Sequence, residues 1–134
     1  MRLLLSLFIA ASCSLSGCAT TQEPYAELDT TRTGRADIDE SSVVITGQGS
    51  QMNMRPQTRV MLQLGRQLVE VRTLRSDVRI KSKIATLAID AKPCLRYFVV
   101  AKHPVGANPQ DWYVEISKTE PMPECQVTAS TPAK

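Results

Sequence analysis

The sequence predicts an all-β protein, a small antiparallel sandwich held by one disulfide bond. Short runs of alternating apolar and polar residues recur along residues 42–125, breaks at Gly, Pro, Asn or Ser-Asp separate them, and two cysteines in this stretch are free to pair. Many short strands with regular turns are typical of a sandwich or a barrel, because each strand buries one face against a second sheet. An α+β fold with a helix near residues 57–74 is the alternative.

The chain begins with the layout of an export signal. Met1 and Arg2 give a positively charged start, and a mostly apolar run follows over residues 3–11. The run is too short to span a bilayer, which takes about 20 apolar residues. A charged start, a short apolar run and then small residues is typical of a secretory signal peptide. We therefore expect residues 1–17 to be removed.

The small residues at the end of this signal carry a family resemblance. The motif Leu15-Ser16-Gly17-Cys18 resembles the lipobox of bacterial lipoproteins. The resemblance implies that the Cys18 thiol receives diacylglycerol, that cleavage occurs just before it, and that an N-acyl chain follows. In enterobacterial lipoproteins an aspartate after the cysteine retains the protein in the inner membrane, so Ala19 implies outer-membrane sorting. We expect an anchor facing the periplasm, stable because it has several acyl chains, and no cofactor.

The mature chain divides into three predicted parts. Residues 18–41 are expected to be the lipidated N-terminus and a flexible tether, because six acidic side chains and few large apolar ones offer little area to bury. Residues 42–125 form the β domain, and residues 126–134 a disordered tail. With Arg2 removed, the 16 basic residues fall to 15, against 13 acidic ones. This balance indicates neither nucleic acid nor a strongly acidic partner.

The first half of the domain contains one ambiguous segment. Val43-Val44-Ile45 predicts a strand, and Met52 and Met54 add a further short one. Two spacings then overlap: residues 61, 64, 68 and 71 fit a helix, whereas residues 60, 62 and 64 and residues 69, 71 and 73 fit two strands. Gly65 would cost a helix about 1 kcal/mol. We favour two strands joined by a hairpin turn at Gly65-Arg66.

The second half alternates more plainly. Three further strands are predicted over residues 78–84, 95–100 and 112–117. Within them, Pro93-Cys94-Leu95-Arg96-Tyr97 resembles the tyrosine corner of fibronectin type III domains. That resemblance implies an immunoglobulin-like topology, in which the tyrosine hydroxyl bonds back to upstream backbone and pins the crossover between the sheets. Trp112 follows the tyrosine strand, whereas family members usually carry a tryptophan in an early strand.

The cysteines left after signal removal are Cys94 and Cys125, since Cys13 leaves with the signal. An exported chain meets an oxidising compartment, which predicts a structural disulfide between them. Closing a loop of this length should stabilise the fold by roughly 3–4 kcal/mol. There is no CxxC pair, and two cysteines with one histidine are too few soft ligands to predict a metal site.

No catalytic set is expected. His103, the only histidine, lies in a loop with two prolines and a glycine, where we expect it to be solvated. The carboxylates are scattered without an acid/base spacing, and no phosphate-binding loop is present. The sequence therefore predicts a protein that is not an enzyme.

Two surfaces are candidates for interactions. Arg79, Lys81 and Lys83 are predicted to share an outward strand face, suited either to an anionic partner or simply to solvent, where lysines also discourage edge pairing. The loop 102–111 contains His103 and leads to Trp112, which is expected in the core, and to Tyr113, which is the better contact candidate.

The expected function is that of a non-catalytic, lipid-anchored envelope lipoprotein, acting as an accessory or assembly module that docks to an envelope protein. The alternative is a small inhibitor lipoprotein that binds a ligand or an enzyme through loop 102–111.

Overall fold

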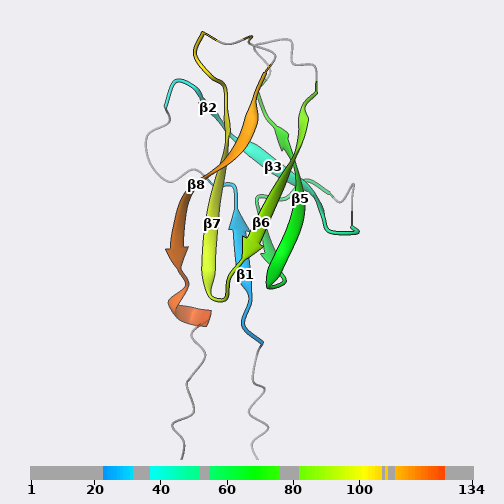
Figure 1. Ribbon diagram of the computed structural model, residues 1–134, viewed down its shortest axis with the longest axis vertical. Helices are drawn as coiled ribbons and strands as arrows, with labels where there is room; N and C mark the ends of the chain where they lie inside the picture. The colour runs from blue at the N-terminus through cyan, green and yellow to red at the C-terminus, as the bar shows by residue number, and fades with distance from the viewer. Residues whose placement is uncertain are drawn as a thin grey trace, which may run out of the picture.

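The computed structural model describes residues 23–31, 37–51, 55–75, 82–106, 108 and 111–125. Within them, strands make up two sheets that face each other, and one short 3-10 helix follows the last strand (Figure 1). The prediction of an all-β fold is confirmed. The helix considered near residues 57–74 is excluded, because this segment forms β4 (Arg59–Leu62) and β5 (Gly65–Thr73).

The first sheet is built around β7 (Leu95–Lys102). Strand β8 (Tyr113–Pro121) pairs along one edge of β7, while β1 (Ala26–Asp29) and β2 (Glu40–Ser41) pair with it as well, and β4 lies outside β1. The pairing of β1 with β7 is parallel, so the sheet is mixed rather than purely antiparallel as predicted. The second sheet has β5 at its centre, between β3 (Val43–Gln48) and β6 (Ile84–Ala91).

The tether predicted for residues 18–41 is wrong at residues 26–29 and 40–41, because these residues form β1 and β2. Ala26 and Leu28 of β1 are fully buried in the core. Two of the acidic side chains that suggested a tether are paired instead: Glu27 accepts a hydrogen bond from Arg96 at 2.6 Å, and Asp29 accepts one from Arg59 at 2.6 Å. Partners distant in the sequence therefore offset the charge of this segment.

The hairpin predicted at Gly65-Arg66 is also wrong. Strand β4 pairs with β1 in the first sheet, whereas β5 pairs with β3 and β6 in the second. The connection through residues 63–64 therefore carries the chain from one sheet to the other. Gly65 has a φ of 90°, a left-handed conformation that glycine adopts without the steric cost of a Cβ.

Strand β6 occupies residues 84–91, later than the strand predicted over residues 78–84, of which residues 78–81 lie outside the described part. Its inward positions are Ala85, Leu87, Ile89 and Ala91. Two of these are alanines, which weakened the alternating signal. Predicted strand residues Met52 and Met54 likewise lie outside the described residues, as do the signal peptide, Cys18 and the predicted tail.

The core lies between the sheets, and its buried cluster consists of aliphatic side chains and the ring of Tyr97, with Trp112 packed against it. The Tyr97 hydroxyl accepts a hydrogen bond from the Lys92 amide (3.0 Å) and donates one to the Asp90 carbonyl (3.3 Å). These bonds hold the turn by which the chain passes from β6 in the second sheet to β7 in the first. The hydrogen bonding expected of a tyrosine corner is thus present.

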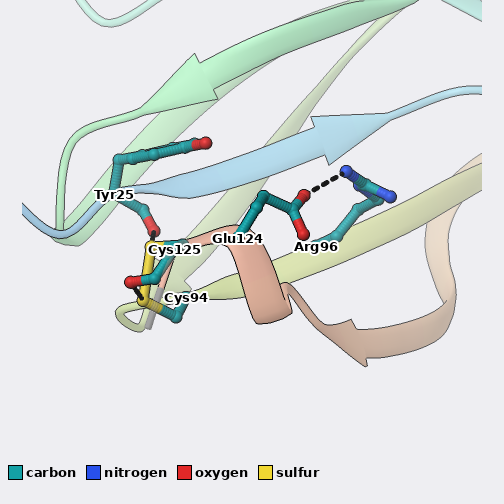
Figure 2. The surroundings of a disulfide bond; sticks show 5 residues. All are labelled: Tyr25, Cys94, Arg96, Glu124 and Cys125. Carbon is teal, nitrogen blue, oxygen red and sulfur yellow. Dashed lines mark hydrogen bonds and ion pairs between the residues drawn. A yellow bond between two sulfur atoms is a disulfide. The ribbon is translucent and has the colours of Figure 1, made fainter. Parts of the chain in front are cut away.

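The molecule has two distinct ends, which Figure 1 shows at the bottom and the top. We call the end at the bottom of Figure 1 the proximal end. It contains the start of β1, the β6–β7 turn, the end of β8 and η1 (Pro123–Cys125). There Cys94 and Cys125 form the predicted disulfide, which lies against Tyr25 (Figure 2). The Cys94 amide also donates to the Tyr25 carbonyl at 2.8 Å. We call the opposite end the distal end. It contains the ends of β5 and β7 and the starts of β3, β6 and β8.

Candidate functional site

Four chain segments meet at the distal end and are tied together by hydrogen bonds of backbone groups. The His103 amide donates to the Asp39 carbonyl (2.7 Å), the Leu74 amide to the Ser42 carbonyl (2.9 Å), and the Thr73 amide to the Lys83 carbonyl (2.9 Å). These bonds join the start of β2, the end of β5, the start of β6 and the end of β7. The distal end is therefore a connected structure rather than a set of separate loops.

A side-chain bridge runs beneath this end from one sheet to the other. Nε2 of His103, just after β7, lies 2.8 Å from Oγ of Ser41 in β2, and this hydroxyl lies 3.0 Å from Oγ1 of Thr73 in β5. The Thr73 oxygen also accepts from the Arg75 amide at 3.2 Å. The bridge satisfies polar groups that would otherwise be costly to bury. It also links β2 of the first sheet to β5 of the second.

His103 is not the solvated loop residue that the sequence suggested, because only 6% of its surface is exposed. Its ring stacks on that of Trp112, with centroids 6.3 Å apart and an interplanar angle of 25°. Trp112 in turn donates from Nε1 to the Ser82 carbonyl at 2.7 Å and packs against the core, as predicted. His103 therefore supports the loop that follows it, and its pairing with Ser41 is buried rather than open to a substrate.

A cluster of charges flanks the bridge. Lys102 donates to Glu40 at 2.7 Å and lies 3.7 Å from a carboxylate oxygen of Asp39 and 4.0 Å from one of Asp37. The hydrogen bond with Glu40, aided by the charges of Asp39 and Asp37, raises the pKa of Lys102 above its ordinary value. These contacts hold residues 37–40 against the end of β7.

The distal end nevertheless exposes large apolar side chains, which we call the distal surface. Its members belong to the connected segments or their flanks, and they are Ile38 (94% exposed), Leu74 (53%), Ile84 (47%), Val105 (83%) and Tyr113 (51%). Single exposed apolar residues are normal, whereas contiguous apolar patches mark interaction sites, and the five residues here lie on joined segments or beside them. Supported from below by His103 and Trp112, this surface is the candidate functional site.

The predicted site residues have different outcomes. Tyr113 is half exposed at the distal surface, where it was expected to make contacts. Lys83 is exposed just before β6, also at the distal end, whereas Arg79 and Lys81 lie outside the described residues, so the basic face stays a prediction.

Sequence reasoning missed Ile38, Leu74 and Ile84. Ile38 stood in the presumed tether, and Ile84 was assigned an apolar strand position. Leu74 directly follows the inward position Thr73, so an apolar side chain stands where the period-2 pattern expects an outward one. This break in the pattern was the signal that could have indicated an exposed apolar residue.

A second charged cluster lies along β1. Asp29 is fully buried and accepts from the Thr31 amide (2.7 Å), the Thr31 hydroxyl, and Nε (2.9 Å) and Nη2 (2.6 Å) of Arg59. Burial raises the pKa of Asp29, but the hydrogen bonds from Thr31 and Arg59 outweigh it, so the pKa lies below its ordinary value. The hydrogen bond to Glu27 raises the pKa of Arg96. Glu124 also accepts from Arg96, at 3.0 Å (Figure 2).

Among the described residues, no three His, Cys, Asp or Glu side chains come together in a way that could hold a metal ion. The same part of the chain forms no helix long and apolar enough to cross a membrane. No protein-family model matches the sequence, and searches of curated proteins and of solved structures find no match either.

Proposed function

We propose that this protein is a non-catalytic lipoprotein of the outer membrane, anchored through Cys18 and facing the periplasm, which docks to an envelope protein through the distal surface. The observation that carries the docking proposal is the group of exposed apolar side chains at the end opposite to the one where the chain enters the fold. An anchor at one end leaves the other end facing the periplasm. The lipobox motif Leu15-Ser16-Gly17-Cys18 supports the anchor.

The docking proposal is tested by crosslinking in the native envelope. A photo-crosslinking residue at Tyr113 should capture a specific protein, and Leu74→Asp should remove that adduct because it places a charge in a desolvated contact. The matched control is Leu68→Asp on the outer face of β5, where the leucine is 51% exposed, against 53% for Leu74. An adduct that survives Leu74→Asp, or is lost equally with Leu68→Asp, contradicts docking at the distal end.

The anchor is tested separately. Cys18→Ala should abolish acylation and leave the chain uncut or soluble. An inhibitor of the lipoprotein signal peptidase should cause the unprocessed form to accumulate. Normal processing under the inhibitor would contradict the anchor and would leave the docking proposal untouched.

One observation favours the alternative, an inhibitor that binds a soluble ligand or enzyme. Val105 lies in a tight turn, 83% exposed, next to Gly106 with a φ of 80°. A protruding apolar side chain on a rigid base is suited to insertion into a cleft. In that case replacing residues 104–109 by Gly and Ser should abolish binding to the soluble target, whereas Leu74→Asp should leave it unchanged. An accessory module predicts that both changes weaken the envelope adduct.

A further inference from the structure

The proximal end carries an open apolar groove of about 620 Å³. Leu62 forms its buried floor, and Pro24, Tyr25, Met61 and Leu64 line it. Met61 is 57% exposed and Leu64 39% exposed, so both side chains offer apolar area to solvent. Of the described residues that line the groove, only Glu23 is charged.

Chain length limits how far this groove can lie from Cys18. The hydrogen bond between the Tyr25 carbonyl and the Cys94 amide fixes the chain from Tyr25 onward. Only residues 19–22 separate Cys18 from Glu23, where the described structure begins. Since an extended chain spans about 3.3–3.6 Å per residue, the Cα atoms of Cys18 and Glu23 are at most about 18 Å apart. The groove is therefore held close to any membrane that binds Cys18.

A similar estimate of length places the distal surface farther from Cys18 than the groove. Strand β5 runs most of the way between the ends with nine residues. At about 3.3 Å per residue it spans roughly 30 Å, more than the longest reach of residues 19–22. The two ends of the domain thus differ in their access to a bilayer.

We propose that the groove faces the bilayer to which Cys18 is anchored, with Met61 and Leu64 in contact with lipid at the membrane interface. The inference rests on the anchor of the proposed function. Tyr25 suits this location, because tyrosine rings are enriched where the apolar core of a membrane meets water. Since Glu23 is the only charged residue among the described lining residues, the contact is apolar, and it should not depend on salt or on anionic lipid. The contact would hold the domain upright, with the distal surface turned away from the membrane.

The test uses mature acylated protein in vesicles of phosphatidylethanolamine and phosphatidylglycerol. Met61→Cys provides a single labelling site, because the acyl group covers Cys18 and a disulfide joins Cys94 to Cys125. A bimane fluorophore at position 61 should lose fluorescence when the vesicles contain lipid with a nitroxide near the head group. This loss should persist at high salt and without phosphatidylglycerol. The matched control is Leu74→Cys at the distal end, where the label should keep its fluorescence.

The outcomes distinguish failure of the groove proposal alone from failure of the anchor. If the protein co-sediments with vesicles but the label at position 61 is quenched no more than the label at position 74, the groove proposal fails and the anchor stands. If the acylated protein does not co-sediment, both fail. A label shielded from aqueous iodide yet not quenched by nitroxide lipid would indicate a protein or the chain's own acyl group in the groove, and would also overturn the proposal. Leu64→Cys must repeat the Met61→Cys result.

Discussion

Asp29 lies at the end of β1 and is completely buried, yet its carboxylate is charged. One carboxylate oxygen accepts from the amide and hydroxyl of Thr31, and the other accepts from the guanidinium of Arg59. Replacing Asp29 by Asn keeps the shape and one oxygen. The new amide group, however, is a donor and would face a second donor, the guanidinium of Arg59. Asp29→Asn should therefore lose the ionic bonds while leaving the packing of β1 intact.

The size of this loss follows from the type of bond. Hydrogen bonds to a charged group contribute about 1.5–3 kcal/mol, so removing the Arg59 contact and weakening the Thr31 contact should lower the free energy of unfolding by about 2–3 kcal/mol at pH 7. The Arg59 side chain is half exposed, which keeps the loss below that of a fully buried pair.

The effect should depend on pH with a defined sign. Because folding lowers the pKa of Asp29, the ionised form stabilises the fold above the unfolded pKa of about 3.9. This contribution disappears as the pH falls through the folded pKa. The stability gap between the wild type and Asp29→Asn should therefore be constant near neutrality and shrink in acid.

Urea unfolding of both proteins between pH 7 and pH 2.5, followed by circular dichroism, measures the gap. The control is Asp90→Asn, an exposed position on β6, which should change the unfolding free energy by less than about 0.5 kcal/mol. A gap that stays constant down to the lowest pH would refute the ionic explanation. A variant as stable as the wild type at pH 7 would refute the assignment of Asp29 as a stabilising residue.

Three further changes have expected magnitudes. Cys94→Ser removes the disulfide to Cys125, which closes a loop at a separation of 31 residues. The change should lower the free energy of unfolding by about 3–4 kcal/mol without changing localisation. Free thiols found in the wild type by mass spectrometry would contradict the disulfide. Tyr97→Phe removes the hydroxyl that bonds to the Lys92 amide and the Asp90 carbonyl at the β6–β7 turn. It should lower the free energy of unfolding, measured by chemical denaturation, by about 1–2 kcal/mol. Arg96→Ala leaves the buried Glu27 short of a partner and should cost about 1–3 kcal/mol in the same assay.

Exposed counterparts serve as controls for the last two changes. Tyr113→Phe removes a hydroxyl from a half-exposed ring, and Lys118→Ala removes an exposed ion pair with Glu120. Both should change stability by at most about 0.5 kcal/mol. If Tyr97→Phe matched Tyr113→Phe, the corner hydrogen bonds would not contribute to stability. If Arg96→Ala matched Lys118→Ala, Arg96 would not act as a buried partner.

Local patterns in the sequence predicted most strands of the domain, because one side of each strand faces the core. Strands β5 and β8 show this alternation in their burial, whereas the central strand β7 is buried on both faces from Tyr97 to Ala101. Strand β1 was not predictable in the same way. Its two acidic residues need Arg59 and Arg96 from distant parts of the chain, and composition alone gives no sign of such partners. The sequence also did not predict that β4 and β5 belong to different sheets, because a glycine turn fits a hairpin and a crossover equally well.

The candidate site was predictable only in part. Tyr113 could be named from its place after the loop and from its alternation with Trp112. The burial of His103 depends on Ser41, which pairs with it across 62 residues of sequence, and on the ring of Trp112. A short β2 brings Ser41 there, and two residues carry too little pattern to predict a strand. The support beneath the distal surface is thus a property of the tertiary fold.

The incorporation of β1 into the sheet changes what the proposed lipid anchor could do. A tether as long as residues 18–41 would allow the domain to turn in any direction, with a mean end-to-end distance of roughly 25–30 Å. With β1 in the sheet, only residues 19–22 lie between Cys18 and the described fold, and they reach at most about 18 Å. This is less than the roughly 30 Å spanned by β5, so a domain anchored through Cys18 could not readily turn its distal end to the membrane that holds the anchor. A partner bound at the distal surface would then have to approach from the periplasmic side, whereas a partner embedded in the same membrane would meet the proximal end or the flanks of the sandwich.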